Sequence, residues 1–145
     1  MLFLLPVLGL FSCKDDAKPD DCGVELKLVQ TIGSFTPNPT PVSGDDMSWQ
    51  ESIVLLNDSS FVKRYAKDGV TSEEGGIYAY ATMDNRSYIQ LTYTNAKNPL
   101  IESCSSASSE EWIQIVSDTE FKNTSWSACD GPTLVYEKTT VSCQD

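Results

Sequence analysis

The amino-acid sequence predicts an all-β protein of about eight antiparallel strands. Short apolar runs, several of them alternating with polar residues, recur between residues 24 and 139. Turn-forming residues separate these runs about every 8–12 residues, which is the spacing of a β-sandwich or a β-barrel. No stretch keeps the period of an amphipathic helix. With 145 residues, the chain is long enough for one domain with one modest core.

The first expected strand covers residues 24–30, where Val24, Leu26 and Leu28 alternate with polar side chains. Residues 33–47 follow it and contain three prolines and two glycines, so they are expected to form a long loop. The remaining strands are expected at residues 49–57, 61–66, 76–82, 87–94, 111–116, 120–124 and 133–139. These segments together account for the eight strands.

The connections between these strands carry recognisable turn residues. Asp68-Gly69 predicts a tight hairpin, because both residues accept the positive φ that such turns need. A second tight turn is expected at Asp84-Asn85. Residues 95–109 are rich in Ser and Asn and are expected to loop, although residues 99–101 could pair briefly.

The first twelve residues form an uncharged apolar segment that is followed at once by Cys13. A membrane span needs about 20 apolar residues, so this segment has the length of a signal peptide instead. Leu10-Phe11-Ser12-Cys13 resembles the lipobox of bacterial lipoproteins. The resemblance implies that residues 1–12 are removed and that the Cys13 thiol carries the lipid. The alternative is an ordinary secretory signal followed by an unrelated cysteine.

The residues after Cys13 are charged and contain proline, as expected of a solvated tether over residues 13–22. Lys14-Asp15-Asp16 resembles the export signal of surface lipoproteins in the Bacteroidetes. That resemblance implies an outer-membrane protein that faces the cell exterior. The alternative is that these charged residues only keep the tether solvated and carry no export signal. The domain itself is then expected over residues 23–145.

The cysteine count favours a closed barrel. Cys13 is assigned to the lipid, and four cysteines remain in an exported chain, where disulfides form. Four cysteines allow three pairings, and free thiols are the remaining possibility. In an up-and-down barrel the first and last strands pair antiparallel, which favours Cys22–Cys143. Cys104 and Cys129 would then lie in loops at the opposite rim and pair with each other.

Several short motifs resemble the small lipocalin-like domains of Bacteroidetes lipoproteins. They are Trp49-Gln50-Glu51, Asp58-Ser59-Ser60-Phe61, Gly75-Gly76-Ile77-Tyr78, Cys129-Asp130-Gly131-Pro132 and Tyr136-Glu137-Lys138. The resemblance covers residues 24–140 and implies a lipocalin-like barrel, in which residues 33–47 would lie where lipocalins carry an entrance lid. These motifs are mostly turns and strand ends, so they indicate a fold and not a ligand.

Composition argues against several classes of function. The chain has no histidine, and histidine is the commonest general base and a common metal ligand. Its net charge of −11 disfavours nucleic acid as a partner. Adjacent carboxylates such as Glu110-Glu111 point to opposite faces of a strand, so we expect them to be solvated. We therefore expect no enzymatic activity, no cofactor and no metal site.

The aromatic side chains are the remaining candidates for binding. Trp49, Tyr78, Tyr80 and Trp112 could line a ligand site, although core packing explains them equally well. Two functions follow. In the first, the barrel is packed solid and its outer surface recognises an unidentified protein or glycan, and we favour this one. In the second, the barrel carries a small hydrophobic molecule under residues 33–47.

Overall fold

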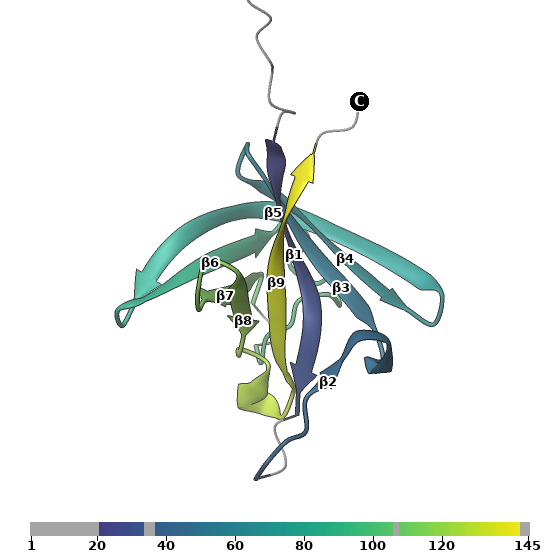
Figure 1. The fold of residues 1–145 in the computed structure, drawn as a ribbon. Coiled ribbons are helices and arrows are strands. Elements are labelled where there is room, and N and C mark those ends of the chain that lie inside the picture. Colours follow the sequence, from purple (N-terminus) through teal and green to yellow (C-terminus); the bar gives the residue numbers. More distant parts are fainter. Residues whose placement is uncertain (1–20, 34–36, 106–107, 143–145) are drawn as a thin grey trace, which may run out of the picture.

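The computed structural model describes residues 21–33, 37–105 and 108–142, which form one antiparallel sheet closed into a barrel (Figure 1). The strands are β1 (Asp21–Ile32), β2 (Val42–Ser43), β3 (Gln50–Leu56), β4 (Ser60–Lys67), β5 (Val70–Met83), β6 (Arg86–Tyr93), β7 (Glu110–Ile115), β8 (Glu120–Asn123) and β9 (Thr133–Ser142). Eight of them build the barrel in chain order, and the two-residue β2 pairs with the end of β1. The predicted eight-stranded barrel is confirmed.

Three segments differ from the prediction. Residues 33–47 are not loop throughout, because they contain β2 and a short 3₁₀ helix, η1 (Gly44–Asp46). β5 begins at Val70, six residues before the predicted start at residue 76, because residues 70–75 continue the pairing with β4. β1 begins at Asp21 and so includes Cys22, which we had assigned to the tether. Residues 99–101 form no strand.

Pairing of β1 with β9 closes the barrel. The register runs from Asp21 opposite Ser142 to Ile32 opposite Thr133, so both strands are paired over nearly their whole length. Figure 1 shows these two strands side by side, with the first and last described residues at the same end. We call this end, which otherwise carries short turns, the terminus end. The opposite end carries the longer connections and is called the loop end.

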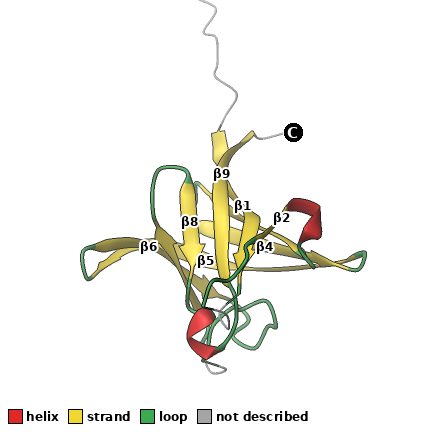
Figure 2. Cartoon of the chain, turned by 60° about the horizontal axis from the view of Figure 1, so that its bottom comes forward, coloured by secondary structure: helices red, strands yellow, loops and turns green. Residues whose placement is uncertain are grey.

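The loop end carries three long connections. They are residues 33–49, 94–109 and 124–132, and the last contains a second 3₁₀ helix, η2 (Ser127–Cys129). Figure 2 turns this end forward and shows the helix and loops gathered there. Among the described residues, no helix is long and apolar enough to cross a membrane.

The core follows from strand alternation, because every second side chain points into the barrel. On β6, Ile89, Leu91 and Tyr93 are buried while the residues between them are partly exposed. The buried apolar side chains of the core cluster are Leu26, Leu28, Met47, Ile53, Leu55, Phe61, Ile89, Leu91, Tyr93, Ile113, Phe121, Leu134 and Tyr136. They come from seven of the eight barrel strands and from the segment before β3.

Backbone conformation explains two features of β5. The hairpin before it is the predicted tight turn, since Asp68 and Gly69 have φ of 52° and 78°. Within the strand, a Cβ on Gly76 would lie 2.0 Å from the Thr92 carbonyl oxygen. Only glycine allows the backbones of β5 and β6 to approach this closely. Gly76 therefore serves the pairing of the two strands from the interior of β5.

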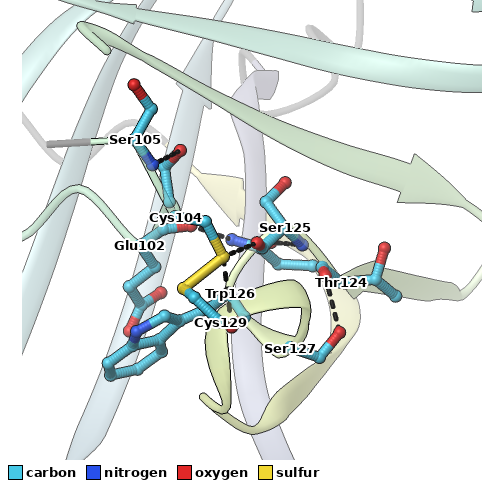
Figure 3. The surroundings of a disulfide bond; sticks show 10 residues. Glu102, Cys104, Ser105, Thr124, Ser125, Trp126, Ser127 and Cys129 are labelled. Carbon is cyan, nitrogen blue, oxygen red and sulfur yellow. Dashed lines mark hydrogen bonds between the residues drawn. A yellow bond between two sulfur atoms is a disulfide. The ribbon is translucent and has the colours of Figure 1, made fainter. Parts of the chain in front are cut away.

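A disulfide joins Cys104 to Cys129 at the loop end (Figure 3), which confirms this predicted pair. The Cα atoms are 5.5 Å apart, and the bond links the 94–109 loop to the connection between β8 and β9. Cys22 is disulfide-bonded. Its predicted partner Cys143, like Cys13 and the Lys14-Asp15-Asp16 motif, lies outside the described residues.

We expect replacement of both Cys104 and Cys129 by Ser to lower the free energy of unfolding by about 3 kcal/mol. The disulfide closes a loop with a sequence separation of 25, which restricts the unfolded chain. Urea unfolding at neutral pH measures the loss. The control is wild type under the same conditions, and an unchanged midpoint would contradict a stabilising role for this bond.

Candidate functional site

A group of charged side chains lies inside the barrel near the loop end. Lys63 of β4 is fully buried and contacts three glutamates, which come from β3, the 94–109 loop and β7. The distances from Lys63 Nζ are 2.8 Å to Glu102 Oε2, 3.1 Å to Glu111 Oε1 and 3.2 Å to Glu51 Oε1. These four residues are called the ionic cluster.

Neutral side chains satisfy most of the other polar atoms of the ionic cluster. Tyr136 Oη donates a hydrogen bond to Glu51 Oε1 at 2.6 Å. Tyr93 Oη donates to Glu111 Oε2 at 2.6 Å, and Asn123 Nδ2 donates to Glu111 Oε1 at 2.7 Å. The second oxygen of Glu51 is buried without a hydrogen-bond partner. The ionic cluster is therefore almost fully hydrogen-bonded, as buried charges need to be.

Burial and charge act in opposite directions on Lys63. Burial alone lowers its pKa, but attraction to Glu111, Glu51 and Glu102 outweighs burial and raises the pKa well above 10.5. Lys63 is therefore charged at every physiological pH.

The glutamates respond differently, because three carboxyls share one ammonium. Burial and mutual repulsion raise the pKa of Glu102 well above 4.5, although Lys63 lowers it. Burial, opposed by Lys63, also raises the pKa of Glu111. The folded chain consequently holds protons on these carboxyls at a pH where an unfolded chain has released them.

The ionic cluster is a structural core and not an open reaction centre. The Lys63 ammonium occupies the point on which the three carboxylates converge, so these carboxylates already have their cation. Among the residues that the structure describes, no group of three or more metal-binding side chains is arranged to hold a metal ion.

Sequence analysis missed the ionic cluster. We expected the Glu110-Glu111 pair to be solvated, and this is wrong for Glu111, which is fully buried. The alternation of the strands did contain a signal. Glu51 stands two positions before buried Ile53, and Lys63 stands two positions after buried Phe61, so both occupy inward positions.

Two of the four aromatic candidates meet, since the rings of Tyr78 and Tyr80 lie edge to face with centres 5.9 Å apart, while Trp49 and Trp112 lie elsewhere. Trp49 lies at the loop end, stacked on Tyr65 with ring centres 6.3 Å apart. Trp112 lies on the outside of the barrel, where its ring meets Tyr88 edge to face at 6.1 Å. Tyr78 packs against the core and donates a hydrogen bond to the Leu56 carbonyl at 2.9 Å.

Tyr80 borders a cavity at the terminus end of the barrel. This cavity has a volume of about 170 Å³. It is lined by Val24, Leu26, Leu55, Tyr80, Ile89, Ile115, Ser117, Asp118, Phe121 and Lys138. It is thus separated by the barrel core from the ionic cluster and from residues 33–47.

The outer surface of β5, β6 and β7 presents a block of uncharged side chains. Cross-strand pairing aligns Ala79 with Gln90 and Trp112. The row on one side is uncharged throughout, and the row on the other side is uncharged until it ends at Glu110, which borders the block. Its members are Ile77, Ala79, Ala81, Tyr88, Gln90, Thr92, Trp112 and Gln114. Within this block, the apolar side chain of Ile77 is 64% exposed. The uncharged character of the block contrasts with the strongly acidic composition of the chain. We call this block the neutral face.

We expect Lys63→Met to lower the free energy of unfolding at pH 7 by about 3–5 kcal/mol, because it leaves three buried carboxyls without a cation. Acidification toward pH 4.5 should restore part of the stability by protonating them. Urea unfolding at both pH values measures this. Lys122→Met, which breaks a partly exposed ion pair with Glu120, is the control and should cost less than about 1 kcal/mol. Equal stability of the two variants at pH 7 would refute the interpretation.

We also expect the stability of the wild type to fall as the pH rises. The pKa values of Glu102 and Glu111 are higher in the folded state than in the unfolded state. The stability that they contribute is therefore complete below pH 4.5, the pKa of the unfolded carboxyl, and is lost as the pH rises through the folded-state pKa values. Each proton retained only by the folded state gives a slope of up to about 1.4 kcal/mol per pH unit. Unfolding midpoints between pH 5 and 9 should fall less steeply for Glu102→Gln. Glu73→Gln, on the exposed Arg64 pair, should keep the wild-type slope, and a wild-type slope in Glu102→Gln would exclude this origin.

Comparison with known proteins provides no relative from which a role could be transferred. No family model, curated protein or solved structure matches the chain.

Proposed function

We propose that the chain is a lipid-anchored protein of the outer membrane that faces the cell exterior. Its barrel then acts as a binding or interaction module and not as an enzyme. The anchor is Cys13, and Lys14-Asp15-Asp16 directs the protein to the surface. Both assignments rest on the sequence motifs, since these residues lie outside the described part of the chain.

The way the barrel interior is filled supports an interaction role. Apolar side chains and the ionic cluster occupy most of it. The apolar cavity at the terminus end, with about 170 Å³, is smaller than the roughly 300–1,000 Å³ of sites for drug-sized ligands. A macromolecular partner would therefore contact the outer surface.

The neutral face is the observation that carries this proposal. Protein interfaces are enriched in aromatic residues and depleted of charged ones at their centre. On the neutral face, Tyr88 and Trp112 supply an aromatic pair, Ile77 supplies exposed apolar area, and Gln90 supplies a central amide. An uncharged surface also avoids the electrostatic repulsion that the rest of an acidic chain presents to another acidic molecule.

A carrier of a hydrophobic molecule under residues 33–47 is less well supported. Met47 from that segment is buried in the core cluster. Trp49 packs against both Tyr65 and Trp126 at the same end of the barrel. Met47 and Trp49 also line an open hollow of about 360 Å³ at this end. The rest of its lining is largely polar or charged, including Asp45, Lys67 and Asp68, which suits a hydrophobic ligand poorly.

The position of β1 gives the anchored molecule an orientation. β1 begins at Asp21 at the terminus end, eight residues after Cys13. A fully extended segment of this length reaches at most about 28 Å. The terminus end would thus stay near the membrane, and the neutral face on the side of the barrel would remain open to partners.

The anchor is tested in cells that produce the full chain. Cys13→Ala should move the protein from the membrane fraction to the soluble fraction, because it removes the thiol that carries the lipid. Replacing Lys14, Asp15 and Asp16 by Ala should keep it in the membrane fraction but protect it from protease added to whole cells. If Cys13→Ala leaves the fractionation unchanged, the protein is not lipidated.

The neutral face is tested in the same cells with a photo-crosslinking amino acid at Gln90. We expect a discrete adduct that Ile77→Asp reduces at least tenfold. The same crosslinker at Ser52, on the outer face of β3, is the matched control and should give none. Adducts of equal yield at both positions, or none at Gln90, would contradict the role of this surface.

A further inference from the structure

The cavity at the terminus end has an apolar floor and a polar rim. Its floor is formed by Val24, Leu26, Leu55, Ile89, Ile115 and Phe121. Its rim carries Tyr80, Ser117, Asp118 and Lys138. The rim therefore brings one ammonium and one carboxylate to the mouth of an apolar cavity.

The volume of the cavity limits the apolar part of a ligand. At about 170 Å³, it is close to the roughly 150 Å³ of an engineered apolar cavity that binds benzene. One aromatic ring or one branched aliphatic group would fill it. A long acyl chain would not fit, because the ionic cluster and the core close the barrel below.

The two charged rim residues come from neighbouring segments of the barrel. Lys138 stands opposite Leu26 of β1, so it occupies an inward position. Its backbone N–H donates to the Thr119 carbonyl at 3.1 Å, which places it beside the turn that carries Asp118. Neither rim charge belongs to any of the ion pairs found among the described residues. Both are thus available to a ligand.

We propose that this cavity binds a free α-amino acid with an apolar side chain. The side chain enters the cavity, the carboxylate faces Lys138 and the ammonium faces Asp118. A simple carboxylic acid would pair with Lys138 but leave Asp118 without a partner, and a simple amine would pair with Asp118 but leave Lys138 without one. This site lies apart from the neutral face, so it goes beyond the proposed function and does not depend on it.

The ligand class is tested by titrating the purified full-length Cys13→Ala chain with three probes that share one ring. They are L-phenylalanine, 3-phenylpropionate and phenethylamine, and the readout is chemical-shift change or calorimetry. We expect L-phenylalanine to bind most tightly. Each of the other two should bind about two- to fivefold more weakly, because each loses one partly exposed ion pair.

Variants assign each part of the site. Lys138→Gln should reduce L-phenylalanine binding to the level of phenethylamine, and Asp118→Asn should reduce it to the level of 3-phenylpropionate. Ile115→Trp should fill the cavity and abolish binding of all three probes. Lys122→Gln, on the outer face of β8, is the matched control and should bind as the wild type does.

Three results would overturn the proposal. They are absence of saturable L-phenylalanine binding, 3-phenylpropionate or phenethylamine binding as tightly as the amino acid, and retention of binding in Ile115→Trp. Because Lys138 and Asp118 are on the rim, their variants keep the core intact. Photo-crosslinking at Gln90 should not respond to L-phenylalanine, so a failure of this site is distinguishable from a failure of the neutral face.

Discussion

The Lys63 ammonium group is the point on which the loop end of the barrel depends. It lies between carboxylates from β3, β7 and the 94–109 loop, and these in turn accept hydrogen bonds from side chains of β6, β8 and β9. Six strands and one loop thus meet around a single charge. A hydrophobic residue at this position could pack, but it could not hold three carboxyls in one arrangement, because the attraction is electrostatic and directional.

The disulfide and the ionic cluster act on the same loop. Cys104 is two residues after Glu102, so the covalent bond to Cys129 restricts the segment that delivers this carboxylate to Lys63. Asn123 adds a hydrogen bond to the Glu102 backbone carbonyl at 3.3 Å. A loop that would otherwise be free to leave the barrel is therefore held at two neighbouring positions. Figure 3 shows Glu102 and Cys104 together beside Trp126.

The two ends of the barrel consequently differ in what they can do. At the loop end, buried charges lie inside the barrel together with Met47, and Trp49 and Trp126 pack against the core. The terminus end has short turns and a small apolar cavity with a charged rim. The outer wall between them carries an uncharged aromatic surface.

Much of the fold could be predicted from local patterns. Alternation of apolar and polar side chains located the strands, and Asp68-Gly69 located a hairpin, because strand period and turn conformation are properties of a few adjacent residues. The Cys104–Cys129 pair followed from barrel closure. The 33–47 segment was predicted less well, because the pairing of Val42 with Thr31 depends on a partner strand and not on its own residues.

The candidate sites were a different matter. Composition and spacing excluded histidine-based catalysis and directed attention to the aromatic residues, but they could not show that Trp49, Tyr80 and Trp112 lie on three separate surfaces. By itself, the sequence determined the strand order and the turns, which are encoded in neighbouring residues. Only the tertiary structure decided which charges are buried and which surface is neutral. Lys63 meets Glu102 and Glu111 across 39 and 48 residues of chain, and no local pattern reports contacts at that separation.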